Sequence, residues 1–180
     1  MLNLSLTYTN DLDNQATNIT NEKITVFYSA SPDNYFFFDN YLTDDTFIVP
    51  TQDMIPFLTV QDNLLLGIKR KNRADVLTFI TSHLDKFKLS PDILSLCANE
   101  VSRNQQTALH IMRAIALKQP VLINQLTDSG ISDKFLFNLL PVLSFFVKKK
   151  QSTIIILTNS TKLLDSTYYD QCINLPSEKD

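Results

Sequence analysis

Apolar and polar residues alternate over positions 2–8, which is the spacing of a strand with one buried face. A second strand is predicted over 24–28, and two short apolar runs follow at 35–38 and 47–49. The first 50 residues are therefore expected to be mainly β structure and loops.

From Leu64 onward, apolar residues recur every three or four positions, the period of a helix buried on one side. Ser90 and Pro91 favour the start of a further short helix, the serine as its cap and the proline in its first turn. Pro141 is expected to kink the last long helix. Helices are predicted over 76–87, from Ser90, over 102–117 and over 135–147.

Three further apolar segments are predicted strands, at 121–123, 153–157 and 173–175. Strands that are apolar along their whole length indicate a parallel sheet covered by helices on both faces. Their alternation with helices is typical of α/β proteins. A length of 180 residues suits one domain of this class.

The composition is that of an ordinary globular protein, with 44% hydrophobic residues, 19% charged residues and a net charge of −3. This balance does not favour nucleic acid or a lipid surface as a partner. The lysines at 148–150 are explained as the solvated end of a helix. We find no signal-peptide pattern and no apolar stretch near the roughly 20 residues of a membrane span. A soluble, cytoplasmic protein is therefore expected.

The residue types that bind metals are few and scattered. Two cysteines and two histidines stand far apart in the sequence, so no zinc site is predicted. His83 and His110 each lie on a predicted helix and are interpreted as packed or surface residues. The acidic pairs at 11–13 and 44–45 are interpreted as solvated turns.

Glycine is unusually rare in this chain. The sequence has only two glycines, Gly67 and Gly130, whereas about 7% of residues are glycine in average proteins. A loop that cradles phosphate with successive backbone N–H groups depends on glycine. Because no two glycines are close together, the sequence contains no standard phosphate-binding loop.

Several strings resemble the motifs of one family. Residues 49–52, Val-Pro-Thr-Gln, resemble a Q-loop with Thr51 inserted, and 58–64 resemble the segment that follows it. Residues 101–123 resemble a signature motif, its helix and a Walker B strand, and 153–158 resemble the strand before an H-loop. In this order and spacing, the strings resemble those of ATP-binding-cassette (ABC) ATPases over roughly residues 49–175.

The resemblance implies a truncated α/β fold like that of P-loop NTPases, with three layers. It implies one domain over residues 1–180. Its parts would be an N-terminal β portion at about 1–60, a small helical subdomain at about 64–117, and core strands and helices at about 118–176.

The stretch at the Walker A position, 28–37, contains neither glycine nor lysine. Pro32 lacks an N–H donor, and Asp33 would repel a phosphate. The interval to the Q-loop is also short, so we expect the phosphate-binding helix to be missing. The aromatic residues at 35–38 either fill this space as a buried strand or form an exposed patch for a partner.

At the two Walker B carboxylates the chain has Asn124 and Gln125. An amide keeps the carboxylate's shape but can neither neutralise Mg²⁺ nor act as a general base. Asn159 stands at the position of the H-loop histidine. The sequence therefore predicts no catalytic residue, no metal and no cofactor.

The signature motif is altered as well. Arg103 and Asn104 replace its two glycines and place bulk where the family's backbone approaches the γ-phosphate. Ser102, Gln105 and Gln52 keep the family's residue types, but Ser102 and Gln105 also have the spacing of a helix capping box. These degenerate positions are not expected to bind nucleotide.

Two functions of different classes remain open. The first is a catalytically inactive regulatory or interaction subunit of an ABC transporter system. Its partners would be a second copy or an active ABC ATPase, with a membrane permease docking near residues 52–100 at the inner face of the membrane. The second is an ATP-binding subunit that contributes Arg103 and the altered signature to a partner's active site. For a third reading, a stand-alone α/β enzyme, we identify no catalytic set.

Overall fold

The computed structural model describes residues 21–30, 46–49, 53–126, 130–149 and 152–175. The strands predicted at 2–8 and 35–38 lie outside these ranges, as do Gln52 and the acidic pairs at 11–13 and 44–45.

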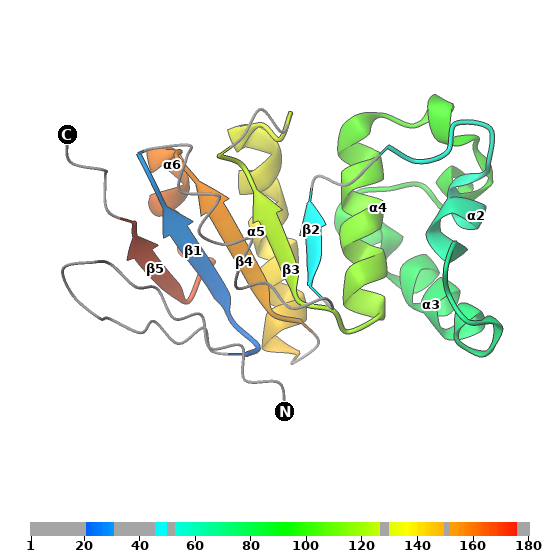
Figure 1. Cartoon of the computed structure of the whole chain (residues 1–180), viewed down its shortest axis with the longest axis horizontal. Helices are drawn as coiled ribbons and strands as arrows, with labels where there is room; N and C mark the ends of the chain where they lie inside the picture. Colours follow the sequence, from blue (N-terminus) through cyan, green and yellow to red (C-terminus); the bar gives the residue numbers. More distant parts are fainter. Residues whose placement is uncertain (1–20, 31–45, 50–52, 127–129, 150–151, 176–180) are drawn as a thin grey trace.

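The strands of the described residues are β1 Ile24–Tyr28, β2 Phe47–Val49, β3 Val121–Asn124, β4 Ile154–Thr158 and β5 Gln171–Asn174. They form one parallel sheet in the order β2-β3-β4-β1-β5 (Figure 1). The predicted strands in this part of the chain are confirmed to within two residues. The sheet buries the apolar runs of β1, β3 and β4, whereas β5 at its edge alternates between half-buried and exposed residues.

The α-helices of the described residues are α2 Val60–Leu65, α3 Arg70–His83, α4 Arg103–Ala116, α5 Asp133–Lys148 and α6 Thr161–Leu164. Short 3₁₀ helices connect them at η2 Leu84–Phe87, η3 Pro91–Ser95 and η4 Ala98–Glu100. The long helices predicted at 102–117 and 135–147 are confirmed with small shifts. Pro141 lies inside α5, which continues through it.

Two helix predictions were wrong in detail. The helix predicted over 76–87 begins earlier, at Arg70. This start was missed because the first turns are polar and carry no apolar signal. It ends at His83, and the chain then tightens into η2, after which Lys88 adopts a left-handed φ of 57°. The short helix predicted from Ser90 is present as the 3₁₀ helix η3, with Pro91 in its first turn, but the Ser90 side chain makes no capping hydrogen bond.

The core has three groups of buried apolar side chains. One lies between a face of the sheet and helices α4, α5 and α6, and includes Val121, Ile156 and Leu140. A second fills the interior of the helical part formed by α2, α3 and α4. In Figure 1 this part stands beside β2 at one end of the sheet.

The third group lies on the opposite face of the sheet and includes Phe27, Leu122 and Ile155. The sequence predicted helices on both faces of the sheet. Among the described residues, however, only strand and loop side chains form this third group. The helices that pack on the sheet contribute their side chains to the first group.

Candidate nucleotide site and docking surface

The residues compared above with the Walker B strand and the H-loop lie at one edge of the sheet, together with the end of β1. All strands are parallel, so their carboxyl ends meet at the same edge, where α/β proteins bind ligands. Ser29, just after β1, donates its backbone N–H to the carbonyl of Thr158 over 2.9 Å. Gln125, just after β3, donates its backbone N–H to the carbonyl of Leu157 over 2.8 Å. The structure thus joins the ends of β1, β3 and β4.

The Gln125 side chain is buried and held at both ends of its amide. Its Oε1 accepts a hydrogen bond of 2.6 Å from the hydroxyl of Thr158. Its Nε2 donates to the Asp133 carboxylate over 2.8 Å and to the carbonyl of Ile131 over 3.3 Å. The amide therefore connects β3, β4 and the beginning of α5.

The other two positions at this edge differ from Gln125. The buried side chain of Asn124 turns back on its own chain, where Oδ1 accepts from the N–H of Leu126 over 3.0 Å. Asn159 is exposed. Its neighbour Ser160 donates its N–H to the hydroxyl of Thr158 over 3.0 Å. Thr158 consequently links the turn after β4 to Gln125.

The signature segment forms the N-terminus of α4, and the predicted capping box is confirmed. The N–H and hydroxyl of Ser102 donate to Oε1 of Gln105 over 3.0 and 2.8 Å. The N–H of Gln105 donates back to the Ser102 hydroxyl over 3.4 Å. This local role accounts for both residues, whose type the family also has.

Arg103 and Asn104 occupy the first turn of α4 and are exposed. The guanidinium of Arg103 lies against Gly130, with its carbon 3.4 Å from where a Cβ on that glycine would stand. Gly130 has a φ of +68°, which other residues rarely adopt. Arg103 therefore reaches from α4 to the chain that leads into α5.

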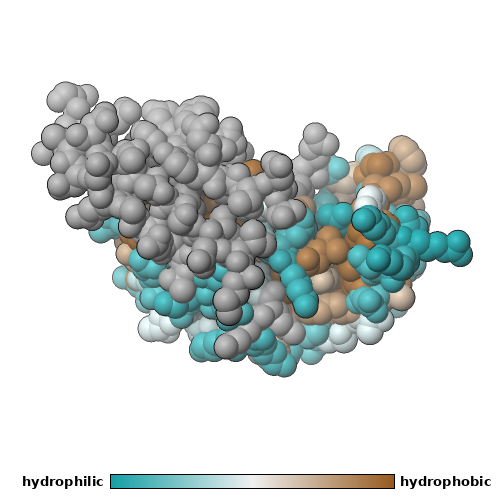
Figure 2. Space-filling view, turned by 60° about the horizontal axis from the view of Figure 1, so that its bottom comes forward, coloured by the Kyte–Doolittle hydropathy of each residue, from teal (hydrophilic) through white to brown (hydrophobic). Residues whose placement is uncertain are grey.

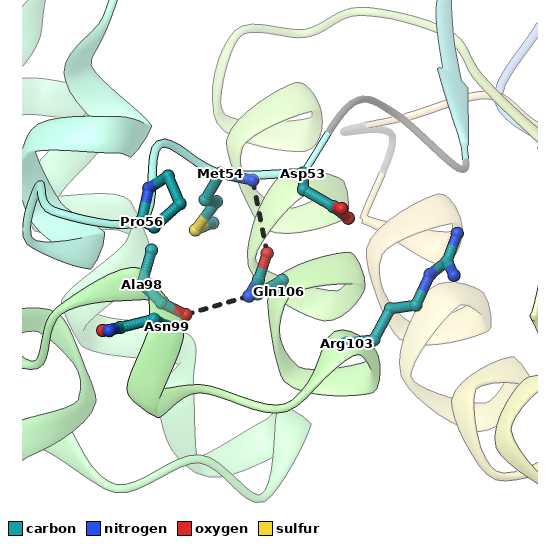
Figure 3. A pocket seen from close by; sticks show the side chains of 7 residues that line it. All are labelled: Asp53, Met54, Pro56, Ala98, Asn99, Arg103 and Gln106. Atoms are coloured by element: carbon teal, nitrogen blue, oxygen red, sulfur yellow. Dashed lines mark hydrogen bonds between the residues drawn. The ribbon is translucent and has the colours of Figure 1, made fainter.

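An open pocket of about 300 Å³ lies between the segment after the Q-loop position and the N-terminal half of α4 (Figure 3). Gln106 forms its floor, accepting from the N–H of Met54 over 3.3 Å and donating to the carbonyls of Ala98 and Val101 over 2.9 and 3.0 Å. Arg103 extends along the side away from Met54 (Figure 3). The remaining residues that line the pocket are Asp53, Met54, Pro56, Ala98 and Asn99.

The fold is similar to that of solved ATP-binding cassettes. The bacterial ABC transporter cassette MJ0796, in its dimeric structure, aligns with 90% of this chain and 84% of its own, at 18% identity and a TM-score of 0.61. The ADP conformation of MJ1267, an ATP-binding cassette of an ABC transporter, aligns with 91% of this chain and 80% of its own, at 14% identity and a TM-score of 0.64. The chain has the ABC cassette fold. No family model and no curated protein matches the sequence.

The helical part of this cassette fold exposes apolar side chains. Phe57 is 80% exposed, far more than a core residue of this size, and Ile55 and Leu96 are 36% and 37% exposed. Hydrogen bonds of 3.4 Å from Asn99 to Pro56 and 2.9 Å from Val60 to Leu96 hold the two loops together. We refer to Ile55, Phe57 and Leu96 as the apolar loop surface.

Figure 2 shows apolar surface bordered by hydrophilic residues at the right of the view, where the helical part lies. Leu66, 44% exposed, adds to the apolar area of this part at the other end of α2. Contiguous exposed apolar area of this kind marks binding surfaces more often than isolated side chains do.

Both histidines, interpreted above as packed or surface residues, are half-buried and lie beside aromatic rings. The ring of His83 lies 4.5 Å from that of Phe79 and 5.1 Å from that of Phe146, measured between centroids. His110 lies 6.1 Å from Phe47, and neither ring nitrogen has a hydrogen-bond partner. Burial, together with the charge of Arg113, lowers the pKa of His110 from 6.5 to about 4.

Within the described ranges, no three histidine, cysteine or acidic side chains gather where they could hold a metal ion. None of the helices in this part of the chain combines the length and the apolar character that crossing a membrane requires.

Two residues of the edge were missed by the sequence analysis. Thr158 was included only as the end of a strand, and Asp133 was not singled out. A signal existed for Asp133, because an acidic residue directly after Ser132 is typical of a helix N-terminus. Its contact with Gln125 could not be read from spacing alone.

Proposed function

We propose that this protein is a pseudo-ATPase: an ABC cassette fold without ATP hydrolysis, acting as an interaction or regulatory subunit of an ABC transporter system. Its place of action would be the cytoplasmic side of the membrane, reached through a permease. The observation that carries the proposal is the hydrogen bonding of Gln125 at the Walker B edge.

A general base must present a lone pair of suitable basicity to the attacking water. The amide of Gln125 has no such basic form near neutral pH, and its oxygen already accepts from Thr158. Asn124 likewise brings no negative charge for Mg²⁺. The stretch at 28–37 lacks both the glycines and the lysine of a phosphate loop.

The apolar loop surface supports a docking role. Phe57 would lose most of its exposed area against a partner, and large aromatic side chains often dominate binding energies. The pocket beside it offers charges of both signs in Asp53 and Arg103, together with the amides of Asn99 and Gln106. A permease segment with one apolar anchor and a polar rim would fit this surface.

Pairing with another cassette is the second part of the proposal. MJ0796 has been solved as a dimer, which makes a second copy or an active ABC ATPase a reasonable partner. The alternative function, an altered signature that completes a partner's ATP site, is favoured by one observation. Ser102 and Arg103 are exposed at the start of a long helix.

Isothermal titration with Mg·ATP tests the loss of nucleotide binding. We expect no saturable heat, while an intact ABC ATPase in the same buffer binds. A dissociation constant in the micromolar range would overturn the pseudo-ATPase proposal. A mixed ATPase assay tests the alternative function, in which the altered signature completes a partner's ATP site. The ATPase rate of this chain mixed with the partner cassette should fall on Arg103→Ala, and an unchanged rate would argue against the alternative.

Co-purification with a co-expressed permease tests the docking surface. Phe57→Asp is expected to abolish it, because the substitution places a charge in the centre of the interface. Phe137→Asp is the matched control, since Phe137 is 46% exposed on α5, outside the apolar loop surface. Equal retention of the permease by both variants would refute docking at Phe57.

A further inference from the structure

The hydrogen bonds of Gln125 depend on which of its atoms donate and which accept. The side chain is only 9% exposed, so water does not replace a partner that is lost. Oε1 accepts from Thr158, and Nε2 donates to Asp133 and to the carbonyl of Ile131. Both of the groups around Nε2 are acceptors, and they require a donor between them.

A carboxylate at this position would fail in two ways. It has no hydrogen to give, so Asp133 and the carbonyl of Ile131 would each face another acceptor. It would also bring a second negative charge to within hydrogen-bond distance of Asp133, in a site with little water to screen the repulsion. An uncompensated buried charge is among the most destabilising changes in a protein.

We propose that the amide of Gln125 is a conformational latch that holds β3, β4 and the beginning of α5 in one arrangement, and that the fold requires it to be neutral. The inference goes beyond the proposed function, because it concerns the folded chain without nucleotide or partner. The residue at the position of a catalytic carboxylate has acquired a structural role that excludes a carboxylate.

The latch extends into the turn after β4. Thr158 is fully buried, and its hydroxyl donates to Gln125 while accepting from the N–H of Ser160. Moving α5 away from β3 would break the bond to Asp133, and moving the turn would break the bonds of Thr158. The edge of the sheet therefore resists the separation of these elements.

The test compares two amide-to-carboxylate substitutions in the full chain. Gln125→Glu should lower the melting temperature by roughly 10 °C at pH 8. Gln105→Glu is the matched control and should leave the melting temperature unchanged. The Oε1 of the exposed Gln105 only accepts hydrogen bonds, and a glutamate suits a capping box. Equal melting temperatures for the two variants would overturn the proposal.

A pH series separates charge from shape. The introduced carboxyl should have a pKa above its ordinary value of about 4.3, because burial and the charge of Asp133 both disfavour ionisation. Once protonated it can donate to Asp133 again. The defect of Gln125→Glu relative to wild type should therefore shrink by at least half between pH 8 and pH 5. A defect that is independent of pH would mean that shape, not charge, is responsible.

The reciprocal double variant keeps the proposal falsifiable if Gln125→Glu alone fails to fold. Adding Asp133→Asn turns the acceptor into a donor and removes the like charge, so at least half of the lost melting temperature should return. Amide exchange at Leu126 and Ser160 should be faster in Gln125→Glu and slower again in the double variant. A double variant as unstable as the sum of its single changes would refute a direct pairing of the two side chains.

Discussion

Arg113 joins α4 to the end of α2, and removing its guanidinium should destabilise the helical part. Its Nε donates to the carbonyl of Leu64 and its Nη2 to the carbonyl of Leu66, both over 2.8 Å. Carbonyls at the end of a helix have no partner within it, and a cation there also complements the helix dipole. The arginine of the helix that resembles the ABC motif thus has a structural role here.

The size of the effect follows from these contacts. A hydrogen bond from a charged donor contributes about 1.5–3 kcal/mol. Burial offsets part of this, as it also lowers the pKa of the Arg113 guanidinium from its ordinary value. We expect Arg113→Met, which keeps the apolar stem, to cost about 3 kcal/mol of unfolding free energy. In a chain of this length that corresponds to a melting temperature lower by roughly 6–12 °C.

Urea unfolding followed by circular dichroism measures this difference. Arg73→Met is the matched control, because Arg73 makes a single bond of 3.0 Å to the carbonyl of Ile68. Because Arg73 is exposed and water competes for this bond, that variant should lose only about 1 kcal/mol. The stability of Arg113→Lys should lie between those of wild type and Arg113→Met. Lysine keeps the charge but lacks the planar guanidinium that donates two hydrogen bonds at once. Equal losses for the two methionine variants would refute the reasoning.

Two more predictions concern pH and glycine. The folded pKa of His110, about 4, lies below the unfolded value of 6.5, so the unfolded chain binds the extra proton between these values. The unfolding free energy should fall by up to about 3 kcal/mol from pH 7 to pH 4, and His110→Leu should remove this part of the pH dependence in urea titrations. Gly67→Ala and Gly130→Ala should each lower the melting temperature, because both glycines have a positive φ, which costs other L-residues roughly 1–2 kcal/mol. An alanine variant as stable as wild type at either position would contradict this.

The sequence predicted those parts of the fold that depend on local pattern. The run Ile154–Thr158 is fully buried, and its continuous apolar character was sufficient to predict a strand. The capping box of Ser102 and Gln105 needs only a spacing of three residues, and it was predicted for that reason. The start of α3 was missed because residues 70–75 are polar and exposed.

The arrangement of the strands required the folded structure. Ile24 pairs with Ile154, and no local pattern indicates a partner at that separation. The same holds for the site. Asn124 and Gln125 were predicted as neutral substitutes for two carboxylates, yet the sequence did not reveal that Gln125 contacts Asp133 and Thr158. Those contacts depend on how the ends of β3 and β4 meet the start of α5.

The bond between Gln125 and Asp133 also determines the order in which substitutions could restore a charged edge. A glutamate at position 125 would face the existing carboxylate of Asp133 and would weaken the fold. A change of Asp133 would have to come first, although by itself it brings no catalytic gain. Because the two side chains are coupled, introducing a carboxylate at position 125 would require a change at position 133 as well.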